Sequence, residues 1–180
     1  MKQLLPPGIC LTCTDPCCHF NKGEDEHAPF FTEEQYREIM KRGFSREMMH
    51  YLPKRKVYQS KLRQNKGDDY VCAFFIDNKC MVYDIRPLEC KLWPFFITKN
   101  QEKDKVMLAV DLDTFCPGVK KNLLETESGQ SYVKYLIEFL SSEEIVSMFA
   151  KNPGLLHEFD PEFIYVGELK HITSAVFNKS

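Results

Sequence analysis

The spacing of apolar and polar residues predicts a helix soon after residue 30. Thr32 and Gln35 stand at the N-cap and third helical positions of a capping box, in which each side chain bonds the other residue's backbone N–H. Gly43 is typical of the residue just beyond a helix end. We therefore expect a helix between Thr32 and Gly43. We also expect Ser45 to cap a second short helix that Pro53 ends.

Further along, the pattern changes to that of β-strands. Residues 71–76 form an apolar run that predicts one buried strand, followed by a turn at 77–79 that leads into Cys80. Residues 106–112 predict a second buried strand. The segment 54–69 is polar and rich in cations, which favours a solvated surface, and we expect it to be the most mobile part of the chain.

The last third of the chain is predicted to be mainly helical. Four apolar residues fall on one helical face: Val133, Leu136, Ile137 and Leu140. Ser142 is expected to begin another helix, and a short strand at 162–168 to precede a last helix near 168–177. The mixture of strands and helices predicts the α+β class: a small single domain with irregular Cys-rich loops and short strands around a metal site, and a helical C-terminal third.

Length and charge restrict the possible functions. The 180 residues correspond to one domain, with 43% hydrophobic and 28% charged residues. The formal net charge of −2 gives no electrostatic reason to expect a nucleic acid or an anionic membrane as a partner. The first apolar stretch ends at Pro6 and Pro7, short of a secretory signal, so we expect a cytoplasmic protein with reduced cysteines.

Eight cysteines are the candidate metal ligands, and all lie in the first two thirds of the chain. They fall into two sets, Cys10-x2-Cys13-x3-Cys17-Cys18 and Cys72-x7-Cys80-x9-Cys90-x25-Cys116. A Cys-x2-Cys step brings two thiolates to one metal from a tight loop. Buried apolar thiols are the alternative, and for Cys72 taken alone they are the better interpretation. Eight cysteines are, however, enough for two complete four-thiolate sites.

The adjacent pair Cys17 and Cys18 limits how the ligands are shared. Neighbouring residues of an extended segment point to opposite sides, so the two thiolates suit two centres or different atoms of one cluster. One arrangement gives each cysteine set its own metal. In the other, the sets are interleaved and the first set supplies both centres. The sequence leaves both open.

Positive or hydrogen-bonding groups are needed close to such a site, because eight thiolates around two divalent ions leave a charge of about −4. Lys79, Arg86 and Lys91 are near the cysteines in the sequence, and we select Arg86 as the donor to a cysteine sulfur. An ordinary surface arginine is the alternative. His19 and His27 are near the first set and are either additional ligands or exposed polar residues.

The motif order resembles the YkgJ-type cysteine-cluster family, which is described as a zinc- or iron-chelating domain. The resemblance rests on the CxxCxxxCC opening, on the later Cys80-x2-Tyr83-x2-Arg86-Pro87-x2-Cys90 core and on Cys116. It spans roughly residues 10–118. One branch of the family is similar to flagellin lysine methylases, in which such a cluster is associated with iron–sulfur chemistry.

The expected function is therefore metal binding, with zinc or an iron–sulfur cluster held by the eight cysteine thiolates and metal ions as the partners. The alternative is an iron–sulfur enzyme, for example one with a protein lysine methylase-like activity. We identify no catalytic motif, since the chain has no Gly-rich phosphate loop, nucleophile elbow or HExxH motif. Residues 1–118 are assigned to the cysteine-cluster metal-binding region and residues 119–180 to a helical C-terminal part of the same domain.

Overall fold

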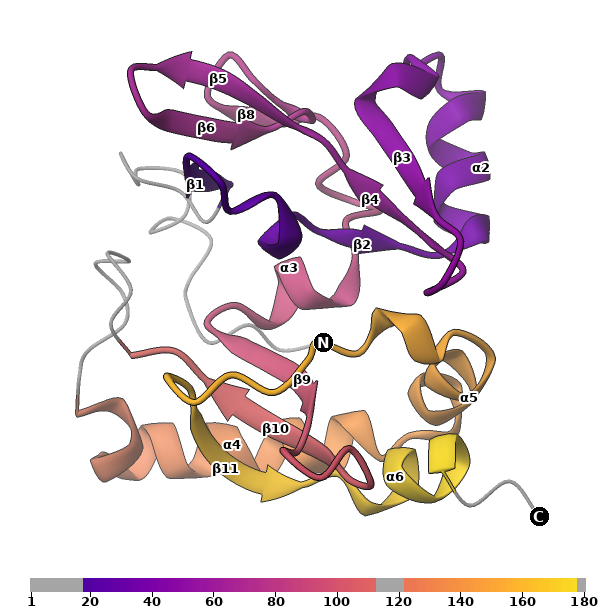
Figure 1. The fold of residues 1–180 in the computed structure, drawn as a ribbon. Helices are drawn as coiled ribbons and strands as arrows, with labels where there is room; N and C mark the ends of the chain where they lie inside the picture. Colours follow the sequence, from indigo (N-terminus) through magenta and orange to yellow (C-terminus); the bar gives the residue numbers. More distant parts are fainter. Residues whose placement is uncertain (1–17, 113–121, 178–180) are drawn as a thin grey trace. The chain divides into compact units, whose positions relative to one another are not determined.

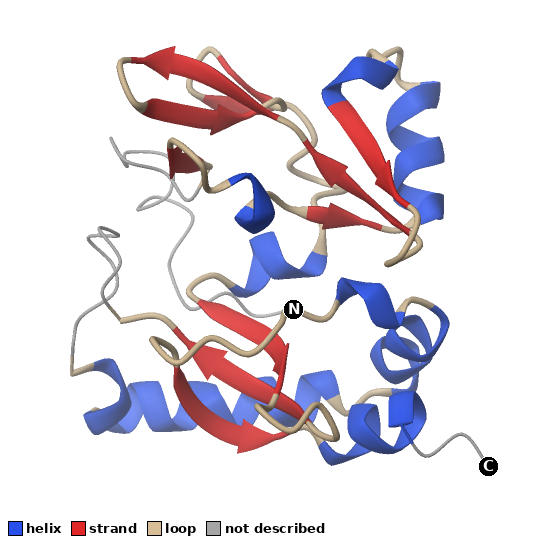
Figure 2. Cartoon of the chain, in the orientation of Figure 1, coloured by secondary structure: helices blue, strands red, loops and turns tan. Residues whose placement is uncertain are grey.

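The computed structural model describes residues 18–112 and 122–177, which fall into two compact units. The N-terminal unit is Thr14–Lys91, and the C-terminal unit is Leu92–Ser180 together with Met1–Cys13. Helices and short antiparallel strands occur in both units, so the predicted α+β class is confirmed (Figure 2).

Two three-stranded antiparallel sheets and one hairpin form the N-terminal unit (Figure 1). The first sheet has the spatial order β1 (His19–Asn21), β6 (Asp69–Cys72) and β5 (Leu62–Lys66). The second has the order β2 (Phe30–Phe31), β4 (Val57–Ser60) and β3 (Met49–Leu52), and the hairpin pairs β7 (Phe75–Ile76) with β8 (Lys79–Cys80). The helical segments are η1 (Asp25–His27), α2 (Glu33–Lys41), η2 (Arg46–Met48) and α3 (Leu88–Leu92). Both sheets therefore join strands that are far apart in the sequence.

Helix α2 confirms the predicted capping box. The Thr32 hydroxyl accepts the backbone N–H of Gln35 at 3.2 Å, and the Gln35 side-chain oxygen accepts the N–H of Thr32 at 3.0 Å. The helix ends at Lys41, and Gly43 takes a φ of +85°, which glycine adopts without strain. Ile39 is fully buried on the inner face of the helix.

The second predicted helix is wrong beyond its first turn. The Ser45 hydroxyl accepts the N–H of Glu47 at 3.2 Å, but it caps only the single 3-10 turn η2. Strand β3 then begins at Met49, well before Pro53. Residues 49–52 pair along their whole length with β4, and this pairing replaces the local helical preference.

The predicted strand over residues 71–76 is two strands rather than one. Strand β6 ends at Cys72, and β7 begins at Phe75 and pairs with a different partner. Just beyond β6, the Ala73 N–H still donates to the Lys61 carbonyl at 2.9 Å, in the register of the β5 pairing, whereas Phe75 pairs with Cys80. An apolar run cannot distinguish a continuous buried strand from two short ones separated by a buried turn.

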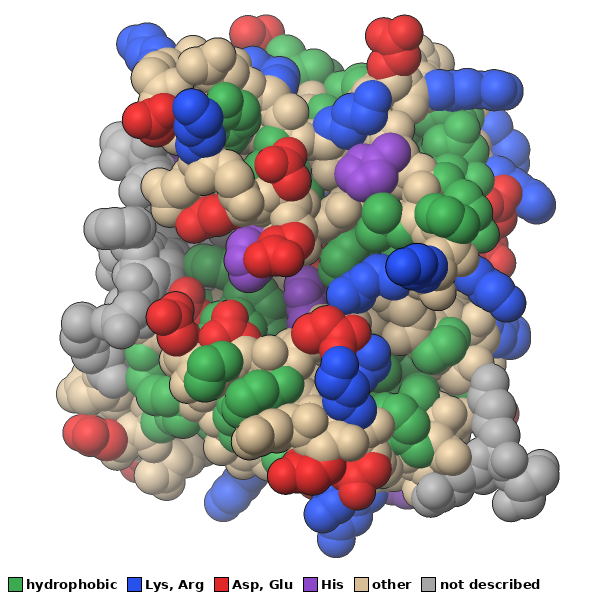
Figure 3. All heavy atoms as spheres, viewed as in Figure 1, with side chains coloured by type: hydrophobic (Ala, Val, Ile, Leu, Met, Phe, Trp, Pro, Cys, Tyr) green, Lys and Arg blue, Asp and Glu red, His purple; other side chains and the backbone are tan. Residues whose placement is uncertain are grey.

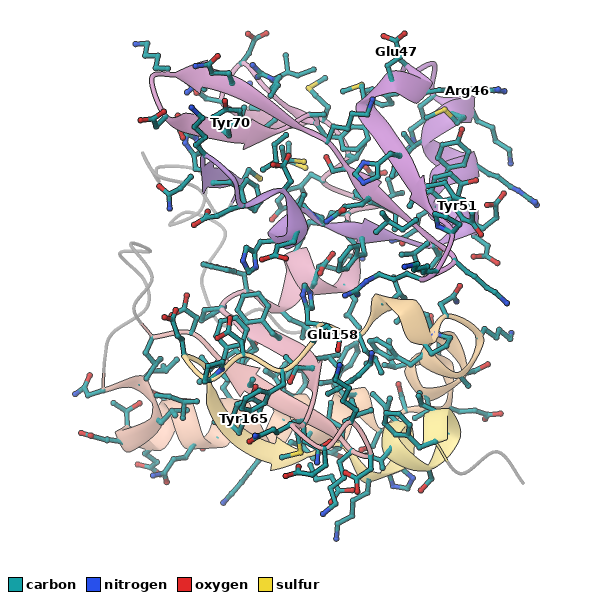
Figure 4. The ribbon with its side chains drawn as sticks, viewed as in Figure 1. Arg46, Glu47, Tyr51, Tyr70, Glu158 and Tyr165 are labelled. Carbon is teal, nitrogen blue, oxygen red and sulfur yellow. The ribbon has the colours of Figure 1, made fainter. Side chains whose placement is uncertain are left out.

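The polar segment 54–69, expected to be the most mobile part of the chain, contains β4 and β5. The predicted solvated surface is present in β5, where residues 63–66 are exposed, but not in β4. Strand β4 is the central strand of its sheet, and its Gln59 and Ser60 side chains are buried. Tyr58 of β4 stacks on Tyr36 of α2, with ring centres 3.8 Å apart. Tyr51 lies on β3, beside Tyr58 on this sheet (Figure 4).

The C-terminal unit has one sheet and most of the helices. The sheet has the spatial order β11 (Ile164–Glu168), β10 (Val106–Val110) and β9 (Phe95–Lys99). The helical segments are η3 (Leu123–Glu125), α4 (Glu127–Leu140), α5 (Glu143–Lys151), η4 (Pro153–Leu155) and α6 (Lys170–Phe177). The second predicted strand, the C-terminal strand and the helical character of the last third are thus confirmed.

Helix α4 packs its predicted apolar face against this sheet. Leu136 and Leu140 are fully buried. The rings of Tyr132 and Phe95 lie 5.8 Å apart between α4 and β9. Of the helices in the part of the chain that the structure describes, none is both long and apolar enough to cross a membrane.

Candidate metal centre

The structure brings together one cysteine from each of the two sequence sets. Strands β1 and β6 are antiparallel, with His19 opposite Val71. The next residues outward in this register are Cys18 and Cys72, and the Cys72 N–H donates to the Cys18 carbonyl at 2.9 Å. Side chains directly opposite each other in such a pair lie on one face, with Cβ atoms about 5 Å apart. Cys18 and Cys72 are therefore cross-strand neighbours.

Cys80 follows the turn that the sequence predicted, and this turn connects the two strands of a hairpin. Asp77 and Asn78 take φ values of +48° and +58°, the left-handed conformation that both central residues of a type I′ turn require. Asn and Asp tolerate this conformation better than other side chains do. The turn fixes the register, so that Cys80 lies opposite Phe75.

All three of these cysteines pack against one apolar cluster of the N-terminal unit. Cys72 is buried within the cluster, and Cys18 and Cys80 are half-buried against it. The other buried members are Phe31, Ile39, Met49, Val71, Phe74, Phe75 and Val82. A thiol there experiences a low-dielectric environment, so a thiolate needs a metal ion or hydrogen-bond donors to be stable.

Cys90 has a different setting. It lies in the short helix α3 and is half-buried. The neighbouring Glu89 carboxylate accepts a hydrogen bond from the backbone N–H of Phe30, which fastens α3 to β2.

The remaining four predicted ligands, Cys10, Cys13, Cys17 and Cys116, lie outside the described residues. Within residues 18–112 and 122–177, no group of three or more His, Cys, Asp or Glu side chains is arranged to hold a metal ion. The described cysteines contribute soft sulfur donors in an apolar environment. This donor set fits zinc or an iron–sulfur cluster, and it does not fit magnesium or calcium, which prefer oxygen ligands.

His19 is held by a carboxylate at hydrogen-bond distance, whereas the Nε2 of His27 lies 3.8 Å from an exposed Glu26 carboxylate oxygen. The His19 Nδ1 lies 2.9 Å from an Asp69 carboxylate oxygen, and Asn65 donates to the other oxygen at 2.7 Å. The Asn65 and His19 hydrogen bonds hold the pKa of Asp69 below its usual value, although partial burial opposes them. An ionised carboxylate only accepts hydrogen bonds, so Nδ1 of His19 carries the proton. The His27 side chain is 48% exposed.

The structure places Arg86 over an aromatic ring. Its guanidinium carbon lies 4.0 Å from the centre of the Tyr83 ring, a cation–π arrangement. Lys79 is exposed and Lys91 is half-buried. The described contact of Arg86 is therefore with this ring. Its role as a donor to a cysteine sulfur stays a prediction.

Sequence analysis missed Ser60, which contacts a predicted ligand. The Ser60 hydroxyl oxygen lies 3.1 Å from the Cys72 sulfur, and both side chains are buried. Serine in a polar segment carries no signal of such a role, because the contact depends on how β4 and β6 are brought together. We identify no local pattern that would have revealed it.

Charges on the outer surface are mixed in sign. Blue and red side chains are interspersed over the face drawn in Figure 3. Arg42 donates to both carboxylate oxygens of Asp84, at 2.9 and 2.8 Å, and these bonds hold the pKa of Asp84 below its usual value. Lys99 and Glu158 form a similar exposed pair. Such pairs are screened by water and salt, and they mark no functional site.

Comparison with known proteins identifies one family. Residues 9–117 match the model of the CxxCxxCC family, described as "Putative zinc- or iron-chelating domain". The match covers more than half of the chain and includes all eight cysteines. This chain has three residues between Cys13 and Cys17, one more than the family's name indicates. No curated protein and no solved structure matches the chain.

Proposed function

This chain belongs to the CxxCxxCC family, and from that premise we propose that it binds zinc or an iron–sulfur cluster through its cysteine thiolates. The family description supports metal binding, with metal ions as partners of the protein. The proposed ligands are the eight cysteines, Cys10, Cys13, Cys17, Cys18, Cys72, Cys80, Cys90 and Cys116. Thiolates are soft ligands, which favour zinc and iron–sulfur clusters over magnesium and calcium.

The observation that carries the proposal is that Cys18, Cys72 and Cys80 all pack against one apolar cluster. Isolated buried cysteines are common, and one such residue would be weak support. Here three cysteines from three separate chain segments pack against the same cluster, and two of them are direct cross-strand neighbours.

The same pairing favours the interleaved arrangement of ligands. Cys18 belongs to the first cysteine set and Cys72 to the second, yet their backbones are hydrogen-bonded. If each set bound its own metal, these neighbours would have to direct their thiolates to separate centres. A centre shared by Cys18 and Cys72 needs no such separation. The other ligands of this centre would come from the remaining cysteines.

Metal binding would also stabilise a Cys72 thiolate within the apolar cluster of the N-terminal unit. Bound zinc would crosslink strands that are distant in sequence, whereas an iron–sulfur cluster would add electron-transfer chemistry. We assign residues 1–118 to the metal-binding region and residues 119–180 to supporting helical packing. A cytoplasmic location would keep the thiols reduced.

The test is anaerobic purification followed by metal and acid-labile sulfide analysis. We expect stoichiometric zinc, or iron with sulfide and a visible absorption spectrum. The variants Cys18→Ser and Cys72→Ser should lose most of the metal. Val71→Ala is the matched control, because Val71 is buried beside Cys72 and its truncation weakens the same core without removing a sulfur.

Two results would contradict the proposal. The first is a wild-type protein without bound metal whose cysteines are paired as disulfides. The second is equal metal content in the cysteine variants and in Val71→Ala, because metal loss would then follow the stability of the core and not the ligands.

A further inference from the structure

Ser60 is held firmly at the end of β4. Its side chain is 1% exposed, and its backbone N–H donates to the Pro29 carbonyl at 3.0 Å. The hydroxyl oxygen lies 3.0 Å from the Lys61 carbonyl and 3.1 Å from the Cys72 sulfur. The hydroxyl therefore has two described partners, the Lys61 carbonyl and the Cys72 sulfur.

The protons available decide how these contacts are made. A serine hydroxyl has one proton to donate and two lone pairs to accept with, and a carbonyl oxygen only accepts. When Cys72 is a thiol, its S–H donates to Ser60, and Ser60 donates to the Lys61 carbonyl. When Cys72 is a thiolate, the form that binds metals, the sulfur has no proton and can only accept. The contact then requires Ser60 to donate to the sulfur.

Turning the hydroxyl toward the sulfur leaves no carbonyl without a partner. The Lys61 carbonyl also accepts the backbone N–H of Ala73 at 2.9 Å. It keeps this bond when the Ser60 proton moves away. The Cys72 sulfur gains a donor inside an apolar cluster, where an anion is otherwise costly.

We infer that Ser60 is a positioning residue of the metal centre, whose hydroxyl donates a hydrogen bond to the metal-bound Cys72 thiolate. This inference rests on the proposed function, because it requires Cys72 to be a ligand. It assigns to a hydroxyl of β4 the role that the sequence suggested for Arg86. A hydrogen bond to a ligand sulfur stabilises the bound state and lowers the electron-donating character of that sulfur.

The experiment compares two pairs of proteins that differ in this hydroxyl. The first pair is wild type and Ser60→Ala. The second is Ser60→Thr and Ser60→Val, which have the same shape and differ only in the hydroxyl. Ser141→Ala is the control, because the Ser141 hydroxyl bonds only a backbone carbonyl, that of Ile137 at 2.7 Å. Metal affinity is measured by chelator competition, with cobalt(II) as the coloured probe if the purified protein is colourless.

Each loss of the hydroxyl should weaken metal binding by about tenfold, at the lower end of what removing a ligand's hydrogen-bond partner costs. It should also shift the sulfur-to-metal charge-transfer band to lower energy, which a purely structural role would not do. Ser60→Thr and Ser141→Ala should behave as wild type. In a Cys72→Ser background, Ser60→Ala should have no further effect on affinity.

The outcomes separate this inference from the proposed function. If Cys72→Ser loses metal while Ser60→Ala and Ser60→Val keep the wild-type affinity and band, the role of Ser60 is refuted and metal binding stands. If Cys72→Ser itself keeps full metal content, Cys72 is not a ligand and both fail. If Ser60→Ala does not fold, the Thr and Val pair decides the question.

Discussion

The buried side-chain amide of Gln59 joins β4 to the segment that precedes β2. Gln59 is 4% exposed, and its side-chain nitrogen lies 2.9 Å from the Asp25 carbonyl, 3.2 Å from that of Glu26 and 3.0 Å from that of Ala28. The amide group has two protons for three acceptors, so at least one bond is shared. Gln59→Glu replaces this donor by a group of the same shape, and it tests whether the donor holds η1 in place.

The expected cost follows from these contacts. At pH 7 the new carboxylate can only accept, so two hydrogen bonds of about 1 kcal/mol each are lost and carbonyl oxygens face a negative charge. We expect a loss of about 3 kcal/mol in the free energy of unfolding. Burial and the facing carbonyls raise the folded-state pKa of the introduced carboxyl above its unfolded value of about 4.3. Because this pKa is raised, the protonated carboxyl favours the folded state below the unfolded pKa, and this contribution disappears as the pH rises. The destabilisation of Gln59→Glu relative to wild type should therefore be smaller at pH 4 than at pH 7.

Urea unfolding monitored by circular dichroism at pH 4 and pH 7 measures both effects. Gln64→Glu is the matched control, because the Gln64 amide is exposed and donates to the Gly67 carbonyl at 2.7 Å. It should change stability by less than about 0.5 kcal/mol. The reasoning is refuted if Gln59→Glu is as stable as wild type at pH 7. It is also refuted if the loss is equally large at both pH values.

Three further predictions concern other described contacts. Desolvation and the Glu33 carboxylate raise the pKa of Tyr58 to about 12. The stabilisation that protonated Tyr58 gives the fold below pH 10 is therefore lost between about pH 10 and 12. Tyr58→Phe should remove the last step of the tyrosinate absorbance titration. Burial raises the pKa of Glu158 (Figure 4), but Lys99 and Lys103 together lower it below its usual value, so these ion pairs stabilise the fold above about pH 4.5. Glu158→Gln should therefore lose less stability than wild type on acidification, by under about 1 kcal/mol in denaturant titrations. At Asn78, where φ is +58°, glycine should preserve or raise the melting temperature and Asn78→Val should cost about 1–2 kcal/mol.

Local signals allowed part of the fold to be predicted. The capping box at Thr32 and the turn at Asp77 and Asn78 are decided by neighbouring residues, and both are correct. Strand β4 escaped prediction because its buried side chains include Gln59 and Ser60, which resemble surface residues until their partners are known. Those partners come from other strands and loops, so no local pattern contains them.

In the candidate site, too, local sequence identifies some features and the pairing of distant segments decides the others. Spacing alone selected the cysteines, because closely spaced thiols are chemically distinctive. Which thiols meet is a property of strand pairing, and the contact between Cys18 and Cys72 joins distant parts of the sequence. Arg86 was selected because it is near the cysteines in the sequence, and its described contact is with the Tyr83 ring. Its role as a donor to a cysteine sulfur stays a prediction.

X-ray absorption at the edge of the metal that copurifies anaerobically with the full chain shows whether cysteine sulfur holds that metal. We expect a shell of about four sulfur atoms near 2.3 Å, for zinc or for iron in a cluster. Cys72→Ser should lose this signal or replace one sulfur by a lighter atom. A first shell made only of oxygen and nitrogen would contradict the account.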